Sequence, residues 1–401
     1  MAAKDLTASA RSFRLMLVYQ LSQHVPLYWP YMFVYVTSVR GLPASDFGLL
    51  KSIYYFGVMA AEVPLGVVAD RLGRRTTLFV AALANCAACA LYAAGAGFAV
   101  FAAAELLFAL TTALQSGADS ALLFDAYAAD DRAHEFARAK GLLDASGLVA
   151  ATAAFSLAGL LVSSDGDATV PYLVTGVLSL AGAAAAFALR EPPRVSTVHV
   201  RRHVANALRD LVRTPGLIAI LAYAALVYAA LRAANALVWN PVLASSGVPV
   251  GLYGVLTGAV SLLGALAAWR ADAWRRGVGA TTLAVAIAAS LAGMYALLAL
   301  APGWWSVPIL LSHGLALGAM PVLVVDLLNR RIVASERRAT LLSFESMFQR
   351  GSYGVLVYAA ASALDTSSLS TVLLGFAALC AVPLALAVRI RDVAAEPPNA
   401  R

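Results

Sequence analysis

Acidic side chains inside long apolar segments are the residues of this chain with the clearest capacity for chemistry. Asp119 lies in the segment 115–120, and Thr112 and Glu105 precede it at intervals of seven residues. On one continuous helix this spacing places the three side chains on the same face. Because desolvation favours the protonated form of a carboxyl group, carboxyls on such a face can take up and release a proton. The alternatives are a structural hydrogen-bonded pair for Asp119 and contact with interfacial water for Glu105.

Glu62 is a further acidic candidate, four residues before Gly66 and on the same helical face. Pro64 lies between them and disturbs the helical backbone. A glycine at this position permits close packing against a neighbouring helix, for which we expect the eleventh span. Glu62 is then expected either to pair with Arg350 or to act as a second proton site.

Other polar and aromatic residues in the spans are candidates for lining a substrate cavity. Arg232 can attract an anionic solute or hold Asp119 ionised, unless its side chain snorkels to the interface. His24 and His313 are each either a proton relay or a hydrogen-bonded core residue. Aromatic rings can enclose an amphipathic or cationic ligand. The full set of cavity candidates is Arg232, His24, His313, Tyr31, Tyr35, Thr112 and Gln115.

The elements that position these residues follow from the composition. Of 401 residues, 61% are hydrophobic and 13% are charged, and the mean hydropathy is +0.78, far more apolar than a soluble domain. Runs of about 20 apolar residues cross a bilayer as helices. They begin near residues 13, 46, 76, 97, 138, 168, 215, 248, 279, 304, 338 and 368. The sequence therefore predicts an all-α integral membrane protein with twelve transmembrane helices.

Basic residues set the orientation of these spans. With the spans placed in this way, 25 of the 29 Lys and Arg residues fall on the side that also holds both termini. Positive residues near span ends stay in the cytoplasm, so both termini are expected there. The net charge of +7 is then a consequence of orientation, and no nucleic-acid partner is expected. The preference for Arg over Lys and the Ala-rich spans suggest a bacterial inner membrane protein.

Clusters of metal ligands and nucleotide-binding motifs were also considered. Cys86, Cys89 and Cys380 all lie in apolar spans, where small packing residues are the simplest interpretation. A phosphate-binding loop of the G-x-x-x-x-G-K-[ST] type is not found in the sequence. We therefore expect no metal, no cofactor and no enzymatic activity.

A repeat divides the chain into halves. Acidic residues recur at an offset of 201 or 202 residues, in the pairs Asp125 and Asp326, Glu135 and Glu336, Asp144 and Glu345, and Asp70 and Asp272. Many transporters are built from such repeats, with the substrate site near the bilayer midplane. We expect a six-helix bundle over residues 1–190, a linker with an amphipathic surface helix over 191–214, and a second bundle over 215–401.

A charged loop between two apolar segments carries a family resemblance. The pattern G-x-x-A-D-R-x-G-R-R, from Gly66 to Arg75, resembles the loop between the second and third helices of the major facilitator superfamily. The resemblance implies rocker-switch alternating access, a turn at Gly73, and Asp70 capping the eleventh helix. The residues expected to form the gate and hinge are Gly66, Asp70, Arg71, Gly73, Arg74, Arg75, Asp125, Arg138, Asp144, Asp272, Asp326, Arg338, Glu345 and Arg350.

Two departures bear on the branch of that family. Drug–proton antiporters that it resembles carry an arginine where this chain has Thr112, and a proline signature that is missing from residues 141–161. The segment 116–125 is nevertheless similar to bacterial members grouped with drug and tetracycline exporters. We expect a monomeric transporter that exports a small organic solute and is coupled to protons through Asp119. One alternative is proton-coupled or passive uptake of a metabolite, for which an anion is a candidate. The other is a non-transporting receptor on the same scaffold.

Overall fold

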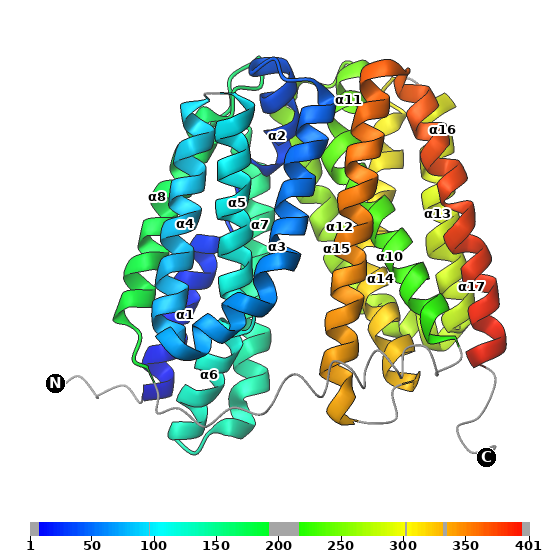
Figure 1. Cartoon of the computed structure of the whole chain (residues 1–401). Coiled ribbons are helices and arrows are strands. Elements are labelled where there is room, and N and C mark those ends of the chain that lie inside the picture. Colours follow the sequence, from blue (N-terminus) through cyan, green and yellow to red (C-terminus); the bar gives the residue numbers. More distant parts are fainter. Residues whose placement is uncertain (1–7, 96, 192–215, 301–302, 332–334, 395–401) are drawn as a thin grey trace. The chain divides into compact units, whose positions relative to one another are not determined.

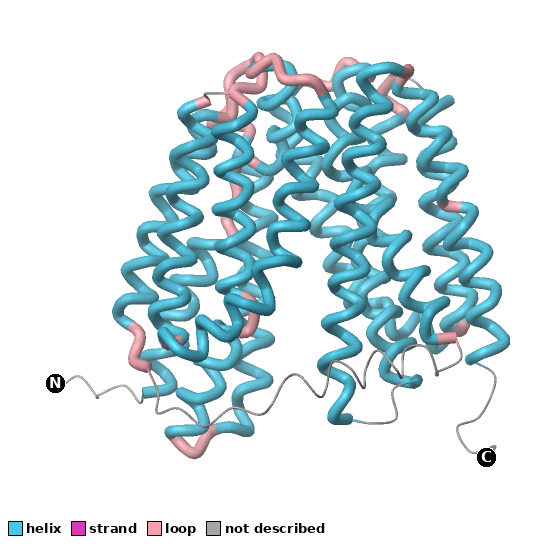
Figure 2. The backbone as a smooth tube through the Cα atoms, in the orientation of Figure 1, coloured by secondary structure: helices cyan, strands magenta, loops and turns pink. Residues whose placement is uncertain are grey.

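The computed structural model describes residues 8–95, 97–191, 216–300, 303–331 and 335–394, and in these ranges every regular element is helical (Figures 1 and 2). The chain divides into two compact units. Unit 1 comprises Met1–Leu42, Ile53–Ser196 and Val250–Gly258; unit 2 comprises Pro43–Ser52, Thr197–Pro249 and Ala259–Arg401. The expected linker over 191–214, with its amphipathic helix, lies outside the described residues except for Glu191.

Unit 1 contains the helices of the first half of the chain. In Figure 1, α4 lies between α5 and α8, with which it makes its most extensive contacts. The elements are α1 (Ala8–Gln23), η1 (Trp29–Tyr31), α2 (Met32–Val34), η2 (Tyr35–Val39), most of α3 (Ala44–Leu72), α4 (Arg74–Ala94), α5 (Phe98–Gln115), α6 (Ala118–Ala129), η3 (Ala133–Glu135), α7 (Phe136–Ala158) and α8 (Thr169–Ala188).

Unit 2 contains the helices of the second half. Here α10 packs against α15, α14 and α17, and α13 against α14, α16 and α17. The elements are α10 (Leu217–Ala233), η4 (Ala234–Val238), α11 (Trp239–Ser245), most of α12 (Tyr253–Val278), α13 (Ala280–Leu300), α14 (Ser306–Arg331), α15 (Ser335–Thr366), α16 (Leu369–Leu379) and α17 (Ala381–Ala394). The short η5 (Val250–Leu252) and the beginning of α12 belong to unit 1.

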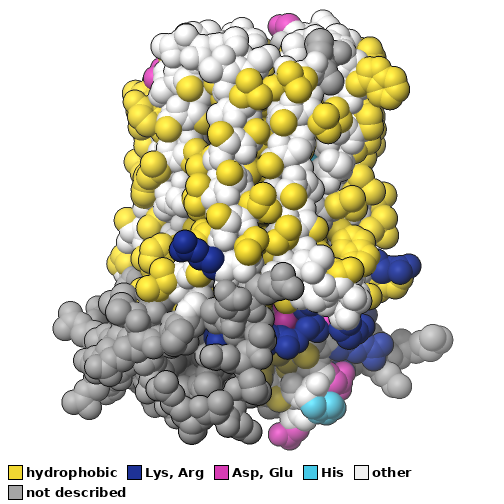
Figure 3. Space-filling model, turned by 90° about the vertical axis from the view of Figure 1, so that its right-hand side faces the viewer, with side chains coloured by type: hydrophobic (Ala, Val, Ile, Leu, Met, Phe, Trp, Pro, Cys, Tyr) yellow, Lys and Arg dark blue, Asp and Glu magenta, His cyan; other side chains and the backbone are white. Residues whose placement is uncertain are grey.

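Each of the twelve expected spans coincides with a helix or a series of consecutive helical segments. Nine helices in the described ranges are long and apolar enough to cross a membrane. The first span is not among them because α1 has only 16 residues, and the chain continues through η1, α2 and η2. On the face shown in Figure 3, apolar side chains are spread over the upper part, and the visible Lys and Arg side chains lie toward the lower end. This segregation is the pattern that a bilayer requires.

The first and seventh spans share an irregularity. A π-helical segment occurs at Tyr35–Val39 in unit 1 and at Ala234–Val238 in unit 2. The two segments are related by an offset of 199 residues, close to that of the acidic repeat. Single π-helical turns inside α-helices frequently lie at functional sites.

Glycines bring particular helices into backbone contact. Gly314 and Gly318 of α14 form a G-x-x-x-G pair, and a Cβ added at Gly318 would lie 1.9 Å from the carbonyl oxygen of Gly264 in α12. Gly254 in α12 makes a similar approach to the Phe155 carbonyl of α7, at 2.2 Å. Close packing of this kind is typical of membrane helices, which gain little from the hydrophobic effect between them.

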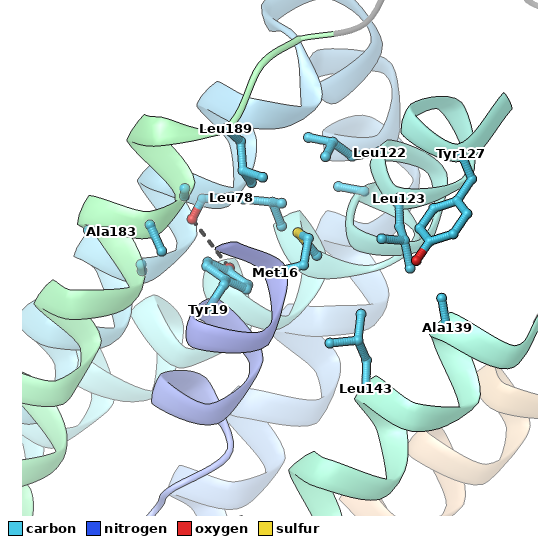
Figure 4. Close-up of a cluster of buried hydrophobic side chains, with 14 residues drawn as sticks. Met16, Tyr19, Leu78, Leu122, Leu123, Tyr127, Ala139, Leu143, Ala183 and Leu189 are labelled. Atoms are coloured by element: carbon cyan, nitrogen blue, oxygen red, sulfur yellow. Dashed lines mark hydrogen bonds between the residues drawn. The ribbon is translucent and has the colours of Figure 1, made fainter. Parts of the chain in front are cut away.

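A buried cluster closes the end of unit 1 that holds α6. Tyr19 donates a hydrogen bond to the Leu78 carbonyl (3.3 Å), and Met16, Leu122 and Leu123 are at most 1% exposed (Figure 4). The same type of contact recurs in unit 2, where Tyr223 donates to the Ala284 carbonyl (2.9 Å). The repeat therefore extends from acidic residues to core hydrogen bonds.

The beginning of α1 is held by Asp130, whose carboxylate accepts a hydrogen bond from the Ser9 backbone N–H (2.7 Å). Hydrogen bonds from the Ser9 side chain and backbone lower the pKa of Asp130 below its usual 3.8. A carboxyl whose pKa is lower in the folded than in the unfolded state stabilises the folded state at pH values above its unfolded pKa. This stabilisation is lost as the pH falls through the folded pKa. We expect Asp130→Asn to lower the melting temperature at pH 7, and this difference to shrink as the pH falls below about 3.8.

The measurement is thermal unfolding of the detergent-purified protein between pH 7 and pH 3. Asp131→Asn is the control, because Asp131 is the adjacent carboxylate and asparagine tolerates its φ of 57°. A melting-temperature difference for Asp130→Asn that persists undiminished at pH 3 would contradict the assigned role of the carboxylate.

Candidate functional site

A break in the fourth span organises the candidate site. Helix α5 ends at Gln115, Ser116 has an extended ψ of 108°, and Gly117 has φ 78°, a left-handed conformation that glycine adopts without strain. Helix α6 then begins at Ala118. The prediction that Glu105, Thr112 and Asp119 share one helical face is therefore wrong for Asp119, because the helix is not continuous between them.

Polar side chains from α1 and α3 converge on this break. The Gln115 amide nitrogen donates to the Tyr19 hydroxyl (3.0 Å) and to Oε1 of Gln23 (3.3 Å). The Ser116 hydroxyl donates to Oε1 of Glu62 (3.0 Å). Two of the predicted residues, Gln115 and Glu62, thus meet here, while pairing of Glu62 with Arg350 stays a prediction.

Asp119 lies in the first turn of α6, beside α7. Its Oδ1 accepts from the Ser120 backbone N–H (2.6 Å), and its Oδ2 lies 3.8 Å from Nζ of Lys140. Lys140 also forms an ion pair with Asp144, one turn along α7. One ammonium group is thus placed between two carboxylates. Lys140 was not identified as a site residue from the sequence, although its i, i+4 spacing from Asp144 is a signal for ion pairing.

Glu105 occupies a different part of unit 1. Its side chain is 1% exposed, so the alternative of interfacial water is wrong for this structure. The Tyr92 hydroxyl donates to Oε1 of Glu105 (2.5 Å). Tyr172 stacks between Tyr92 and Tyr28, with ring centroids 4.7 Å and 4.2 Å apart. This carboxyl is therefore enclosed by aromatic rings.

The charged loop is tied to its own unit. Arg74 forms an ion pair with Asp125 of α6. The Glu191 carboxylate accepts from the backbone N–H groups of Arg74 and Arg75 (2.8 Å each) and so caps α4. Gly73 has φ 95°, as expected for the turn. Glu191, at the start of the central linker, was not identified from the sequence, because a cap from a distant segment leaves no local pattern.

The same ion pair recurs in unit 2. Arg275 lies 3.5 Å from Asp326 and 2.7 Å from Asp272. Residues 74 and 125 are related to residues 275 and 326 by the same offset of 201. Each unit thus joins its charged loop to the end of its fourth span, through Asp125 in unit 1 and Asp326 in unit 2. The repeat in the sequence predicted the correspondence of these two aspartates but not that of Arg74 and Arg275.

Reversing the Arg74–Asp125 pair tests its contribution. The two side chains are 30% and 25% exposed, so we expect each of Arg74→Asp and Asp125→Arg to destabilise unit 1 by about 1–3 kcal/mol, between the values for exposed and buried pairs. The double variant should recover at least half of the loss. Thermal unfolding of the purified protein measures this. Additive losses would show that the pair makes no net contribution.

Other gate candidates are distributed as follows. Glu345 in α15 accepts a hydrogen bond from Gln349, and Arg138 is exposed. A Cβ at Gly66 would meet no heavy atom within 4 Å, whereas one at Gly48 would lie 2.5 Å from Ala361 Cβ. The tight glycine contact of α3 therefore lies at Gly48 in this structure. The side chains of Asp70, Arg71 and Arg338 are outside the described residues.

Several cavity candidates are engaged by the fold itself. The Tyr31 hydroxyl accepts from the Gly254 backbone N–H (3.0 Å), and the Tyr35 hydroxyl donates to the Tyr92 carbonyl (2.7 Å). His24 donates from Nδ1 to the Gln20 carbonyl (3.0 Å). The Thr112 hydroxyl lies 2.9 Å from that of Tyr54. These four residues support unit 1 in the state described.

Arg232 and His313 lie in unit 2. Nε of Arg232 donates to the Tyr228 hydroxyl (3.3 Å), and the guanidinium lies over the Tyr228 ring. His313 is 1% exposed, and its ring packs edge-on against Trp239 with centroids 6.2 Å apart. Trp239 was not identified as a site residue from the sequence.

Metal coordination was examined in the same ranges. In the part of the chain that the structure describes, no three His, Cys, Asp or Glu side chains are grouped so as to hold a metal ion. Cys86, Cys89 and Cys380 are free thiols.

Two helical units with matching ion pairs, π-helical turns and a charged loop define a membrane carrier built from a repeat. The chain belongs to the Major Facilitator Superfamily, whose family model matches residues 25–357. No curated protein sequence matches the chain.

Solved structures with the same fold extend over nearly the whole chain. The nucleoside transporter NupG is 12% identical, with 98% of this chain and 100% of that chain covered and a TM-score of 0.81. A bacterial homologue of the human lysosomal transporter Spinster, inward-facing and unoccupied, is 15% identical, with 98% and 96% covered and a TM-score of 0.69. At these identities the likeness establishes the fold, which is that of multi-pass secondary transporters.

Proposed function

We propose that the chain is a proton-coupled secondary transporter that exports a small organic solute by alternating access across a bacterial inner membrane, with both termini in the cytoplasm. The observation that carries this proposal is the polar cluster at the α5–α6 break, where Asp119, Lys140 and Asp144 share charge. Ionisable groups inside membrane segments are expensive and mark ion or substrate paths.

The shared ammonium group provides a means of coupling. When Asp119 is ionised, the Lys140 ammonium group interacts with two carboxylates. When Asp119 takes up a proton, Lys140 keeps an ion pair with Asp144 only. Protonation in α6 is thereby transmitted to α7, which packs against α6. The side chain of Asp119 is 22% exposed, so its carboxylate can exchange protons with water.

The direction of transport rests on the resemblance of the segment 116–125 to bacterial exporters. The proposal is tested by reconstituting the protein in liposomes with an imposed pH gradient and a panel of organic solutes. We expect solute movement that depends on the gradient and collapses with a protonophore. Movement that ignores the gradient would identify a passive facilitator instead.

Uptake of a polar metabolite is the second candidate. It is favoured by the buried polar residues of unit 2, Arg232, Trp239 and His313, which suit a hydrophilic solute better than a lipophilic one. In the same liposomes, uptake is distinguished by solute and protons moving in the same direction.

A further inference from the structure

Two buried aromatic side chains of unit 2 carry polar atoms that the fold does not satisfy. In the part of the chain that the structure describes, Nδ1 and Nε2 of His313 and Nε1 of Trp239 are buried and have no hydrogen-bond partner. His313 is 1% and Trp239 3% exposed. Such groups are rare in native proteins, because each costs about 1–3 kcal/mol unless a partner is supplied.

The two rings are close enough to share one ligand. Their centroids are 6.2 Å apart with the planes at 71°. His313 belongs to α14 and Trp239 to α11, so the pair joins two elements of the same unit.

We propose that Trp239 and His313 form a binding subsite for a hydroxyl group of the transported solute, and that this solute is neutral and polyhydroxylated. The inference rests on the proposed transport function and adds the chemical class of its substrate. Trp239 offers a donor only, whereas neutral His313 offers one donor and one acceptor. A hydroxyl group can donate and accept at once, and it satisfies both residues.

Charged solutes fit this subsite less well. A carboxylate only accepts hydrogen bonds and leaves the acceptor nitrogen of His313 unmet. A cation is repelled by Arg232, whose charge acts on His313 from α10. The π-helical turn at Ala234–Val238 lies between Arg232 and Trp239 in the chain, and such turns frequently lie at functional sites.

The variant His313→Phe separates a binding role from a structural one. Replacing an unsatisfied buried polar group by an apolar one of similar shape is neutral or stabilising. We expect the melting temperature of purified His313→Phe to equal or exceed that of the unaltered protein. If a resident water satisfied His313, the variant would lose stability, and the subsite would be refuted.

Binding is measured by calorimetry with uridine, D-ribose and D-glucose, and with tetraphenylphosphonium as a lipophilic cation. We expect at least one hydroxylated probe to bind the unaltered protein and its affinity to fall at least roughly tenfold in His313→Phe, as for a lost buried hydrogen bond. If uridine binds, 2′,3′-dideoxyuridine should bind more weakly. His134→Phe is the control, since the side chain of His134 is 77% exposed in the short 3-10 helix η3 of unit 1.

Three results overturn the subsite: no hydroxylated probe binds, His313→Phe binds a probe unchanged, or only the lipophilic cation binds. Failure of the subsite is distinguishable from failure of proton coupling. An intact response to the pH gradient with unchanged binding in His313→Phe refutes the subsite alone. Selective binding without any response to the gradient refutes the coupling alone.

Discussion

Asp119→Asn is expected to abolish accumulation of solute against its gradient while sparing exchange of solute across the membrane. Asparagine keeps the size and one hydrogen-bond acceptor of aspartate, but its side chain does not take up or release a proton near neutral pH. One pH unit supplies about 1.4 kcal/mol per proton, which corresponds to about tenfold accumulation. That factor should fall to one in the variant. Solute distribution in liposomes at an imposed gradient of one pH unit is the measurement.

Asp119→Glu is the matched control for this result, because it retains a titratable group. Asp131→Asn removes an exposed carboxylate that lies outside the polar cluster. Coupling should survive in both variants. Equal accumulation by Asp119→Asn and the unaltered protein would assign coupling elsewhere, with Glu62 and the aromatic-enclosed Glu105 as the next candidates.

Gly318→Ala is expected to have the largest effect on folding. An added Cβ would lie 1.9 Å from the carbonyl oxygen and 2.7 Å from the carbonyl carbon of Gly264, both backbone atoms that no rotamer change can move. Helices α12 and α14 would have to separate. Overpacking costs typically 1–3 kcal/mol and occasionally more, so we expect a loss of at least about 2 kcal/mol and a much lower yield of folded protein.

Gly293→Ala provides the comparison, because Gly293 lies within α13 and a Cβ there would meet no heavy atom within 4 Å. Alanine favours a helix over glycine by about 0.5–1 kcal/mol, so this variant should be as stable as the unaltered protein or slightly more so. Size-exclusion yield and melting temperature in detergent distinguish the two. A similar response of both variants would mean that the α12–α14 contact is not as tight as described.

The sequence predicted the helical class, the spans and the family, because a bilayer enforces long apolar helices and basic loops whatever the details of packing. It also located Asp119, Glu62, Gln115 and the Arg74–Asp125 region through charge and repeat. The assumption of one continuous helix through Asp119 failed, since Gly117 lies in a left-handed conformation that a single apolar run does not reveal. The G-x-x-x-G spacing of Gly314 and Gly318 was a readable signal that the sequence analysis did not use.

What the sequence by itself determined is where charge lies along the chain, and from this the repeat at 201 residues and the predicted topology. The tertiary structure decided which charges meet. Lys140 joins Asp119 to Asp144, Glu191 caps α4 from the linker, and Trp239 meets His313 across 74 residues of sequence. The physical reason is that orientation in a membrane depends on each segment's own composition. Pairing depends on helix rotation and crossing, which are set by contacts between residues far apart in the chain.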